Sequence, residues 1–184
     1  MSAYAEHYRK VAAAFTERVR AVPEGAWENP APCQGWVARD VVRHLVEWLP
    51  DYFFDRWGIA APAGVPTVDE DPVAAWAAVD GAIQAALDDP AVAARIADTR
   101  FGPASFESQI DMICTGDVFL HTWDLARAAG LDERLDPDEV VRMLEGIEPY
   151  DEALRSSGQY GPRVVVPDDA DPQTRLIAFI GRQP

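Results

Sequence analysis

Basic side chains are scarce in this 184-residue chain, which carries 16 Lys and Arg residues against 31 Asp and Glu residues. The formal net charge is −15 at pH 7 and the isoelectric point is about 4.4. A chain with this charge is repelled by the phosphate backbone of nucleic acids and by anionic membrane surfaces. We therefore expect neither nucleic acid nor a membrane among its partners.

Cysteine and long apolar runs are also scarce. The two cysteines, Cys33 and Cys114, are far apart and form no CxxC motif, which excludes a disulfide framework and a cysteine-rich zinc cluster. No window reaches the roughly 18 apolar residues that a membrane-spanning helix needs, and the N-terminal segment lacks the apolar core of a signal peptide. These absences predict a cytoplasmic protein in a reducing compartment.

Helical periodicity is what the sequence has in abundance, because apolar residues recur at steps of three and four in several segments. The predicted helices cover residues 3–22, 38–57, 72–87, 106–129, 137–145 and 172–180. Pro50 predicts a kink or an early break in the second helix. For residues 89–105, where the pattern is weaker, we predict a surface crossover with a short helical or strand-like piece around 91–98. With no run of alternating strands, the pattern predicts an all-α bundle forming a single domain over residues 1–184.

A polar stripe interrupts the most apolar of these helices, in the segment GDVFLHTWDLARAAG (116–130). Residues four apart stack on one helical face, so Asp117 and His121 project side by side and Asp124 follows about one turn later. This spacing is that of a two-ligand metal clamp. The alternative is that these groups satisfy one another or bond to arginines such as Arg127.

His44 offers a third ligand from another helix. It lies in the segment VVRHLVEW, on the face that the apolar periodicity turns inward. Catalytic zinc sites use three nitrogen or carboxylate ligands and keep a fourth position open. The alternative is a core histidine bonded to a nearby carbonyl, although burying two imidazoles and a carboxylate without a partner would cost several kcal/mol. Zn²⁺ is the expected ion, with Ni²⁺ or another divalent ion as alternatives. The third histidine, His7, is expected to be solvated and to take no part in this site.

Three segments, CQGWVARDVVRHL, GDVFLHTWDLARAAG and YGPRVVVPDDADPQTRLIAFIGRQP, resemble actinobacterial proteins of the mycothiol-dependent maleylpyruvate isomerase-like group. That group lies within the DinB-like superfamily of metal-binding bundles. The resemblance implies a DinB-like four-helix bundle with a long crossover and short additional C-terminal helices. It also assigns the metal to His44, Asp117 and His121. Asp124 either orients His121 by hydrogen bonding or forms a salt bridge with an arginine such as Arg127.

The resemblance further implies activation of a low-molecular-weight thiol such as mycothiol, which would make the protein a transferase or an isomerase acting on a small electrophile. A metal-bound thiol loses its proton readily, so no protein cysteine is required as the nucleophile. The true isomerases carry a further C-terminal domain that contributes to catalysis, whereas this chain ends at Pro184. We therefore expect thiol transfer or thiol-assisted isomerisation rather than maleylpyruvate isomerisation itself.

Two local departures from the family pattern affect the site. The metal carboxylate of the true isomerases is a glutamate, and the shorter Asp117 requires the ion to lie closer to its helix or to be held less tightly. Val37 stands where relatives begin the second helix with Ser or Thr, which removes a side-chain cap and leaves Asp40 in the first turn.

Two other classes of function fit the same residues. The chain could be a metal- or ligand-binding bundle without turnover, such as a sensor or a scavenger. It could also be a structural homodimer in which the polar stripe is satisfied internally. Metal content separates the last of these from the other two, and turnover separates the enzyme from the binding protein.

Overall fold

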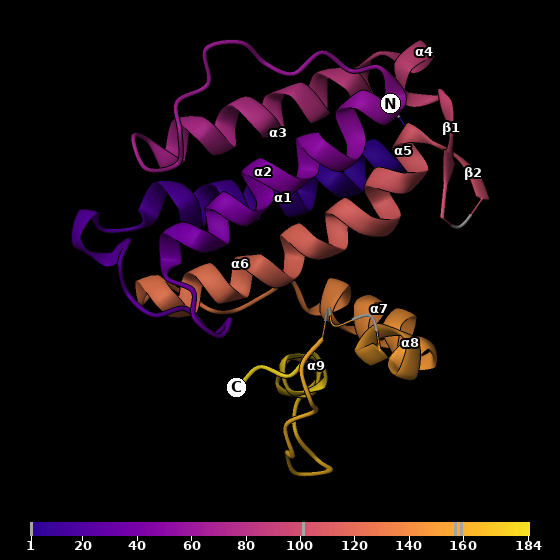
Figure 1. Ribbon diagram of the computed structural model, residues 1–184. Helices are drawn as coiled ribbons and strands as arrows, with labels where there is room; N and C mark the ends of the chain where they lie inside the picture. The colour runs from indigo at the N-terminus through magenta and orange to yellow at the C-terminus, as the bar shows by residue number, and fades with distance from the viewer. Residues whose placement is uncertain (1, 101, 157, 159) are drawn as a thin grey trace. The chain divides into compact units, whose positions relative to one another are not determined.

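The computed structural model describes residues 2–100, 102–156, 158 and 160–184 of the chain. It divides into two compact units, residues 1–132 and 133–184, which are described separately below. Both consist mainly of helices (Figure 1), which confirms the prediction of an all-α, DinB-like bundle. Within the described residues, no helix is long and apolar enough to span a membrane.

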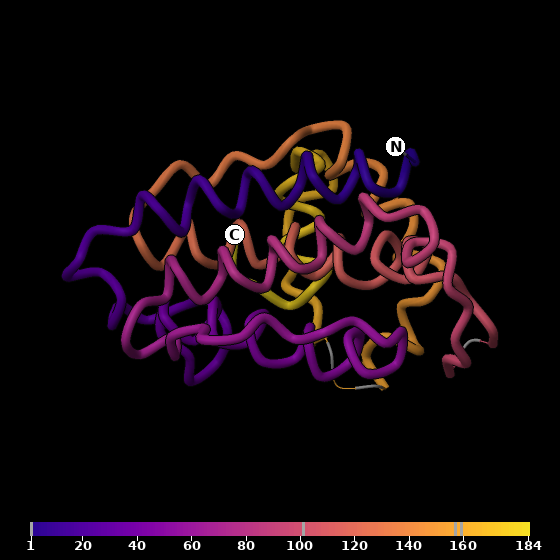
Figure 2. Tube along the Cα trace, turned by 90° about the horizontal axis from the view of Figure 1, so that it is seen from above, coloured from indigo at the N-terminus to yellow at the C-terminus, as the bar shows by residue number. Residues whose placement is uncertain are grey.

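The first unit is built on four long helical segments that run alongside one another (Figures 1 and 2). Both α1 and α2 pack against α3 and α6, and this closes a four-helix bundle. The elements in chain order are α1 (Ala3–Ala21), the 3₁₀ turn η1 (Glu24–Ala26), α2 (Ala38–Trp57), α3 (Pro72–Asp88), α4 (Pro90–Ala93), β1 (Ile96–Thr99), β2 (Gly102–Ser105), α5 (Phe106–Gln109), the π-helical segment η2 (Ile110–Thr115) and α6 (Gly116–Ala129).

The ends of these helices follow from local capping chemistry. The Ser2 hydroxyl accepts a hydrogen bond from the Ala5 N–H at the start of α1. The Asp71 carboxylate does the same for the Ala74 N–H in α3. At the other end, Gly130 adopts φ +67° after α6, a left-handed conformation that ends helices and that glycine adopts without steric cost. The sequence therefore sets these helix limits locally.

Aromatic side chains fill the centre of the bundle. Trp76 is fully buried, and its ring meets that of Phe15 edge-on with 4.8 Å between ring centroids. The indole N–H donates to the Thr16 hydroxyl at 2.8 Å, so the polar edge of this large side chain is also satisfied. The contact joins α3 to α1 and makes Trp76 a main anchor of the core.

The early break expected as one alternative at Pro50 is wrong, because α2 continues to Trp57, and a kink there stays a prediction. A proline inside a helix removes one hydrogen-bond donor and crowds the preceding turn. Leu49 and Phe53 flank Pro50 and are both fully buried. Their packing offsets the local cost and keeps the helix continuous.

The helix predicted over residues 106–129 contains a widened turn in its middle. Residues 110–115 form a π-helical turn, and the Thr115 hydroxyl donates to the Ile110 carbonyl oxygen at 3.1 Å, five residues back. A π turn adds a residue to the helical repeat and offsets the faces on its two sides. The faces of α5 and α6 that meet the bundle are therefore set separately. The preceding crossover forms the antiparallel hairpin β1–β2, which fits the short strand-like piece expected there.

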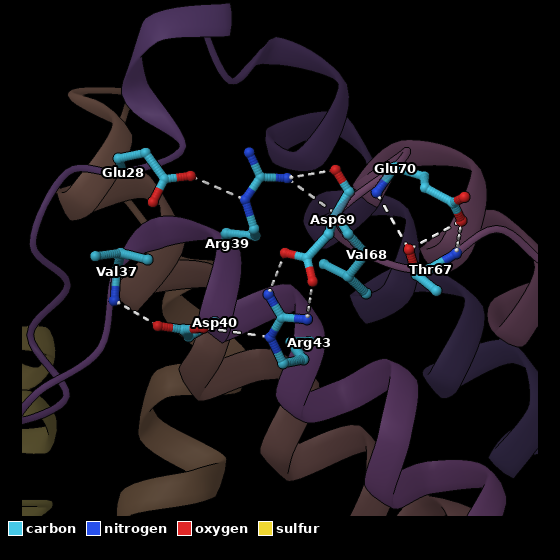
Figure 3. A network of polar contacts seen from close by, with 9 residues as sticks. All are labelled: Glu28, Val37, Arg39, Asp40, Arg43, Thr67, Val68, Asp69 and Glu70. Carbon is cyan, nitrogen blue, oxygen red and sulfur yellow. Dashed lines mark hydrogen bonds and ion pairs between the residues drawn. The ribbon is translucent and has the colours of Figure 1, made fainter.

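The start of α2 is capped without a Ser or Thr side chain. The carboxylate of Asp40 accepts from the Val37 backbone N–H at 3.0 Å and from the Arg43 guanidinium at 3.3 Å (Figure 3). A carboxylate in the first turn of a helix also interacts favourably with the helix dipole. Asp40 thus replaces part of the cap that Val37 cannot provide.

Arginines on α2 hold the long connection between α2 and α3 (Figure 3). Arg43 donates two hydrogen bonds to the Asp69 carboxylate, at 2.7 and 3.2 Å, and these lower the pKa of that carboxyl. Arg39 donates to Glu28 at 3.0 Å and to the Val68 carbonyl oxygen at 2.9 Å. The crossover is thereby fixed along the N-terminal half of α2, next to the turn that carries His44.

The second unit contains α7 (Pro137–Ile147), η3 (Glu148–Tyr150), α8 (Asp151–Ser156) and α9 (Pro172–Phe179), and α7 packs against α9. Its two longer helices confirm the prediction, while α8 was not expected. The Gln173 side chain accepts from the Leu135 N–H at 2.8 Å and donates to the Glu133 carbonyl oxygen at 3.0 Å. These bonds tie α9 to the segment that leads into α7. That the chain acts as one domain over residues 1–184 stays a prediction.

Candidate metal centre

His44 and Asp117 meet where α2 and α6 lie side by side. His44 Nε2 is 3.1 Å from Asp117 Oδ2, and the same oxygen accepts a 2.8 Å hydrogen bond from the Trp48 indole N–H. The side chains of His44 and Asp117 remain 31% and 27% exposed. This edge of the cluster is therefore partly exposed to solvent.

His121 completes the cluster from the next turn of α6. Its Nε2 lies 3.6 Å from Asp117 Oδ1, and its ring centroid lies 4.9 Å from that of His44. One donor atom each from His44, Asp117 and His121 lies within 4.8 Å of the other two. The structure thus brings together the three residues predicted as metal ligands, and their binding of an ion stays a prediction.

The spacing of these donors suits a small divalent ion. Metal–nitrogen and metal–oxygen bonds of about 2.0–2.2 Å in a tetrahedral shell place neighbouring ligand atoms about 3.3–3.6 Å apart. Here Asp117 Oδ2 lies 3.1 Å from His44 Nε2, and the other carboxylate oxygen, Oδ1, lies 3.6 Å from His121 Nε2. Asp117 therefore reaches both imidazoles despite being shorter than the family's glutamate.

Asp124 lies behind the imidazole of His121. It is fully buried, and its Oδ2 is 2.9 Å from His121 Nδ1. This contact fixes the ring so that Nε2 faces Asp117. The sequence left Asp124 divided between orienting His121 and pairing with an arginine, and the structure supplies the first of these contacts. The Arg127 guanidinium lies over the Trp123 ring, 4.6 Å from its centroid.

Cys33 joins this arrangement and was not expected there. Its thiol donates to Asp124 Oδ2 at 3.3 Å, and its side chain is buried beside His121. Trp36, from the same loop, stacks on the His121 ring with 5.8 Å between centroids and also contacts the His44 ring at 5.2 Å. Both residues belong to the CQGW segment that leads into α2. Their position just before the helix that carries His44 was the signal in the sequence that could have placed them near the cluster.

His7 lies apart from this cluster. Its imidazole Nδ1 pairs with the carboxylate of Asp111, and its side chain is only 18% exposed. The prediction that His7 is solvated is therefore wrong. An acidic partner from the π-helical segment holds it instead.

Two opposing effects set the protonation of the cluster without an ion. Burial disfavours the charged form of the His121 imidazole, but the carboxylates of Asp117 and Asp124 outweigh it and raise the pKa of His121 to about 10. Burial likewise opposes ionisation of Asp117, yet the charge of His121 and the hydrogen bond from His44 lower the pKa of Asp117. Without a metal ion, a proton on His121 thus balances the two acids.

The stability of the metal-free protein should fall as the pH rises from about 6.5 towards 10. His121 has a higher pKa folded than its ordinary value of 6.5, so its stabilising contribution is complete below 6.5 and lost as the pH passes its folded pKa of about 10. Chemical denaturation of chelator-treated protein across this range measures the effect. His121→Gln serves as the control and should flatten this part of the profile, whereas an unchanged slope in that variant would contradict the assignment.

The first unit is thus an all-α bundle with a candidate metal centre. Its helices α2 and α6 carry the two imidazoles and the carboxylate of that centre. The chain belongs to the family described as "Mycothiol maleylpyruvate isomerase N-terminal domain", whose sequence model matches residues 8–126. That range contains all three predicted ligands as well as Cys33 and Asp124. The family prediction made from the sequence motifs is thereby confirmed.

Similarity to two curated proteins covers more of the chain than the family model does. Two uncharacterized proteins of Mycobacterium tuberculosis, one from strain CDC 1551 and one from strain H37Rv, are each 28% identical to this chain over 172 residues. Each comparison covers 92% of this chain and 91% of the relative. No solved structure gives a significant match.

Proposed function

We propose that the protein is a divalent-metal-dependent enzyme that uses a low-molecular-weight thiol of the mycothiol type. It would transfer the thiol to a small electrophile or use it to assist an isomerisation. The observation that carries this proposal is the convergence of His44, Asp117 and His121 at an edge that remains partly exposed. Family membership supports the choice of thiol.

The residues present fit a divalent ion, most suitably Zn²⁺. His44, Asp117 and His121 would hold it through two nitrogens and one oxygen, a set that leaves a position for a further ligand. When bound, the ion would supply the positive charge that lowers the pKa of a coordinated thiol towards neutrality. A thiolate rather than a thiol is the nucleophile in additions and displacements.

The surrounding side chains have separate tasks in this proposal. Asp124 would accept a hydrogen bond from the Nδ1–H of His121 and so keep Nε2 directed at the ion. Trp48 donates to Asp117 and holds its carboxylate in place. Trp36 covers the two imidazoles and excludes water from that side. In a displacement the thiol proton leaves to solvent, the sulfur forms a bond to an electrophilic carbon, and the leaving group departs with the electron pair of the broken bond. In an addition the neighbouring carbon of the double bond takes up the electron pair and then a proton from solvent. In an isomerisation the thiolate would instead be expelled again after rotation about the former double bond, and its expulsion re-forms that bond.

The two cysteines do not take part as nucleophiles in this scheme. Both side chains are buried and neither forms a disulfide within the described residues, and a cytoplasmic, reducing environment remains part of the proposal. Burial and the nearby charge of Asp117 raise the pKa of the Cys114 thiol well above its ordinary value. Cys114 therefore remains protonated and unreactive at neutral pH.

Turnover is the direct test of the proposal. Zinc-loaded protein incubated with mycothiol and a panel of epoxides, activated alkenes and alkyl halides should form thiol adducts faster than chelator-treated protein, as measured by mass spectrometry. Addition of Zn²⁺ to the chelated sample should restore the rate. A bound ion without any metal-dependent adduct would overturn the enzyme and favour a metal-binding sensor or scavenger. Protein that binds no ion would overturn both.

A further inference from the structure

Cys33, Asp124 and the Nδ1 edge of His121 form a second group of potential metal-ligand atoms, on the opposite side of the same imidazole. Asp124 Oδ2 lies 3.3 Å from Cys33 Sγ and 2.9 Å from His121 Nδ1. One donor atom from each residue lies within 4.8 Å of the other two. A thiol, a carboxylate and an imidazole thus converge at one point.

The loop that carries Cys33 is placed by contacts of its own. The Asn29 side chain donates to the Ala128 carbonyl oxygen at 3.1 Å, which ties the loop to the last turn of α6. The Trp36 N–H donates to the Cys33 carbonyl oxygen at 3.0 Å, and the Ala31 N–H donates to the Trp36 carbonyl oxygen at 2.9 Å. The backbone that carries Cys33 is therefore held by hydrogen bonds that do not involve its thiol.

Burial of this group favours a cation as its partner, because a buried carboxylate needs a compensating charge. Asp124 is 0% exposed, His121 5% and Cys33 9%. A carboxylate in such surroundings needs charge compensation, and here it accepts hydrogen bonds from an N–H and an S–H. A divalent ion that replaced those two protons would keep all three groups paired. Tetrahedral coordination of a zinc-sized ion by nitrogen, oxygen and sulfur sets ligand atoms about 3.3–3.6 Å apart. The two contacts of Asp124 Oδ2, at 2.9 and 3.3 Å, would therefore lengthen by only a few tenths of an ångström.

We propose that Cys33, Asp124 and His121 bind a soft, thiophilic cation, and that this ion excludes the one held by His44, Asp117 and His121. An imidazole that binds through Nδ1 keeps its hydrogen on Nε2, which faces Asp117 Oδ1 at 3.6 Å. An imidazole that binds through Nε2 keeps its hydrogen on Nδ1, which faces Asp124. Each position thus requires a different tautomer of one ring, and the chain holds one ion at a time.

The two positions differ in ligand chemistry. Thiolate ligands select soft ions, whereas a set of two imidazoles and one carboxylate has no such preference. Cd²⁺ should therefore occupy the sulfur-containing position, displace the other ion and stop thiol transfer. The expected loss of thiol transfer rests on the proposed function, whereas the binding of a soft cation by Cys33, Asp124 and His121 does not.

Cadmium titration of the metal-free, reduced full-length chain tests the proposal. The thiolate-to-cadmium absorption in the ultraviolet should rise and saturate at about one ion per chain, with bound cadmium measured by elemental analysis. Cys33→Ser should abolish the absorption, and Cys114→Ser, which changes the other buried cysteine, should retain it. His44→Ala should also retain it, because His44 contributes only to the first position.

Several outcomes would overturn the proposal. They are the absence of the thiolate band in wild-type protein, its loss in Cys114→Ser but not in Cys33→Ser, and the binding of two cadmium ions per chain. Serine keeps a donor for Asp124, so the Cys33→Ser variant should fold. Cadmium-113 NMR of the wild-type protein distinguishes a sulfur ligand from nitrogen and oxygen ligands without any variant.

The same samples separate this inference from the proposed function. If the soft-cation position is absent, zinc-dependent thiol transfer persists while cadmium shows no thiolate band. If the proposed function fails, no adduct forms with zinc while the Cys33-dependent cadmium band remains. The two failures therefore leave different signatures.

Discussion

Replacing His121 with alanine is expected to abolish divalent-ion binding by this protein. Wild-type chain purified without chelator should carry about one divalent ion, and the variant should carry none. His121 donates the nitrogen that faces Asp117, and it is also the only residue common to both groups of donor atoms found in the described part of the chain. Its loss removes a ligand from each. Elemental analysis of both proteins, purified side by side, measures the result.

Two further variants test whether the loss of the ion depends on the contacts around His121. Asp124→Asn weakens the hydrogen bond that orients the imidazole but keeps every ligand of the first position, so the affinity for zinc should fall by about 10–100-fold rather than vanish. His7→Ala removes a histidine that pairs with Asp111 away from the cluster, and it should keep the ion. Full metal content in His121→Ala would refute the candidate centre. A thermal melt of each variant shows whether the fold survives the change.

Trp76→Ala is expected to give the largest loss of stability of any single substitution considered. The side chain is fully buried, packs edge-on against Phe15 and donates to the Thr16 hydroxyl. Its truncation leaves a large cavity and removes the hydrogen bond to Thr16, at a cost of about 3–5 kcal/mol. The unfolding midpoint should fall by roughly 6–20 °C. Differential scanning calorimetry of metal-free protein measures the shift.

A matched substitution separates this effect from a general sensitivity to mutation. Ile96 is also a large apolar residue, but it is 66% exposed on the β1–β2 hairpin. Ile96→Ala should change the free energy of unfolding by no more than about 0.5 kcal/mol. Equal losses in the two variants would mean that the contact between α3 and α1 is not central to the bundle.

The bundle and the three predicted ligands could be read from the sequence because both depend on helical periodicity. Once His44 is placed on the inward face of one helix and Asp117 and His121 on the inward face of another, packing of those faces brings them together. Interruptions of the periodicity were harder to foresee. Packing of Leu49 and Phe53 overrides the local effect of Pro50, and the π turn at residues 110–115 depends on a hydrogen bond that spans five residues.

The contribution of the loop before α2 was missed for a different reason. Cys33 and Trp36 lie in irregular backbone, where periodicity carries no information about direction. The bond between the Asn29 side chain and the Ala128 carbonyl oxygen places the loop, and it joins residues 99 positions apart. Sequence spacing therefore indicated two distant, unrelated cysteines, whereas folding puts one of them beside the imidazole that matters most.

The bond from Trp48 to Asp117 limits the denticity of the carboxylate. An indole nitrogen cannot coordinate a cation, and its hydrogen occupies a lone pair on one carboxylate oxygen. Asp117 is thereby biased towards ligation through a single oxygen. In the proposed centre, an ion held through a single oxygen of Asp117 would keep a coordination position for an incoming thiol.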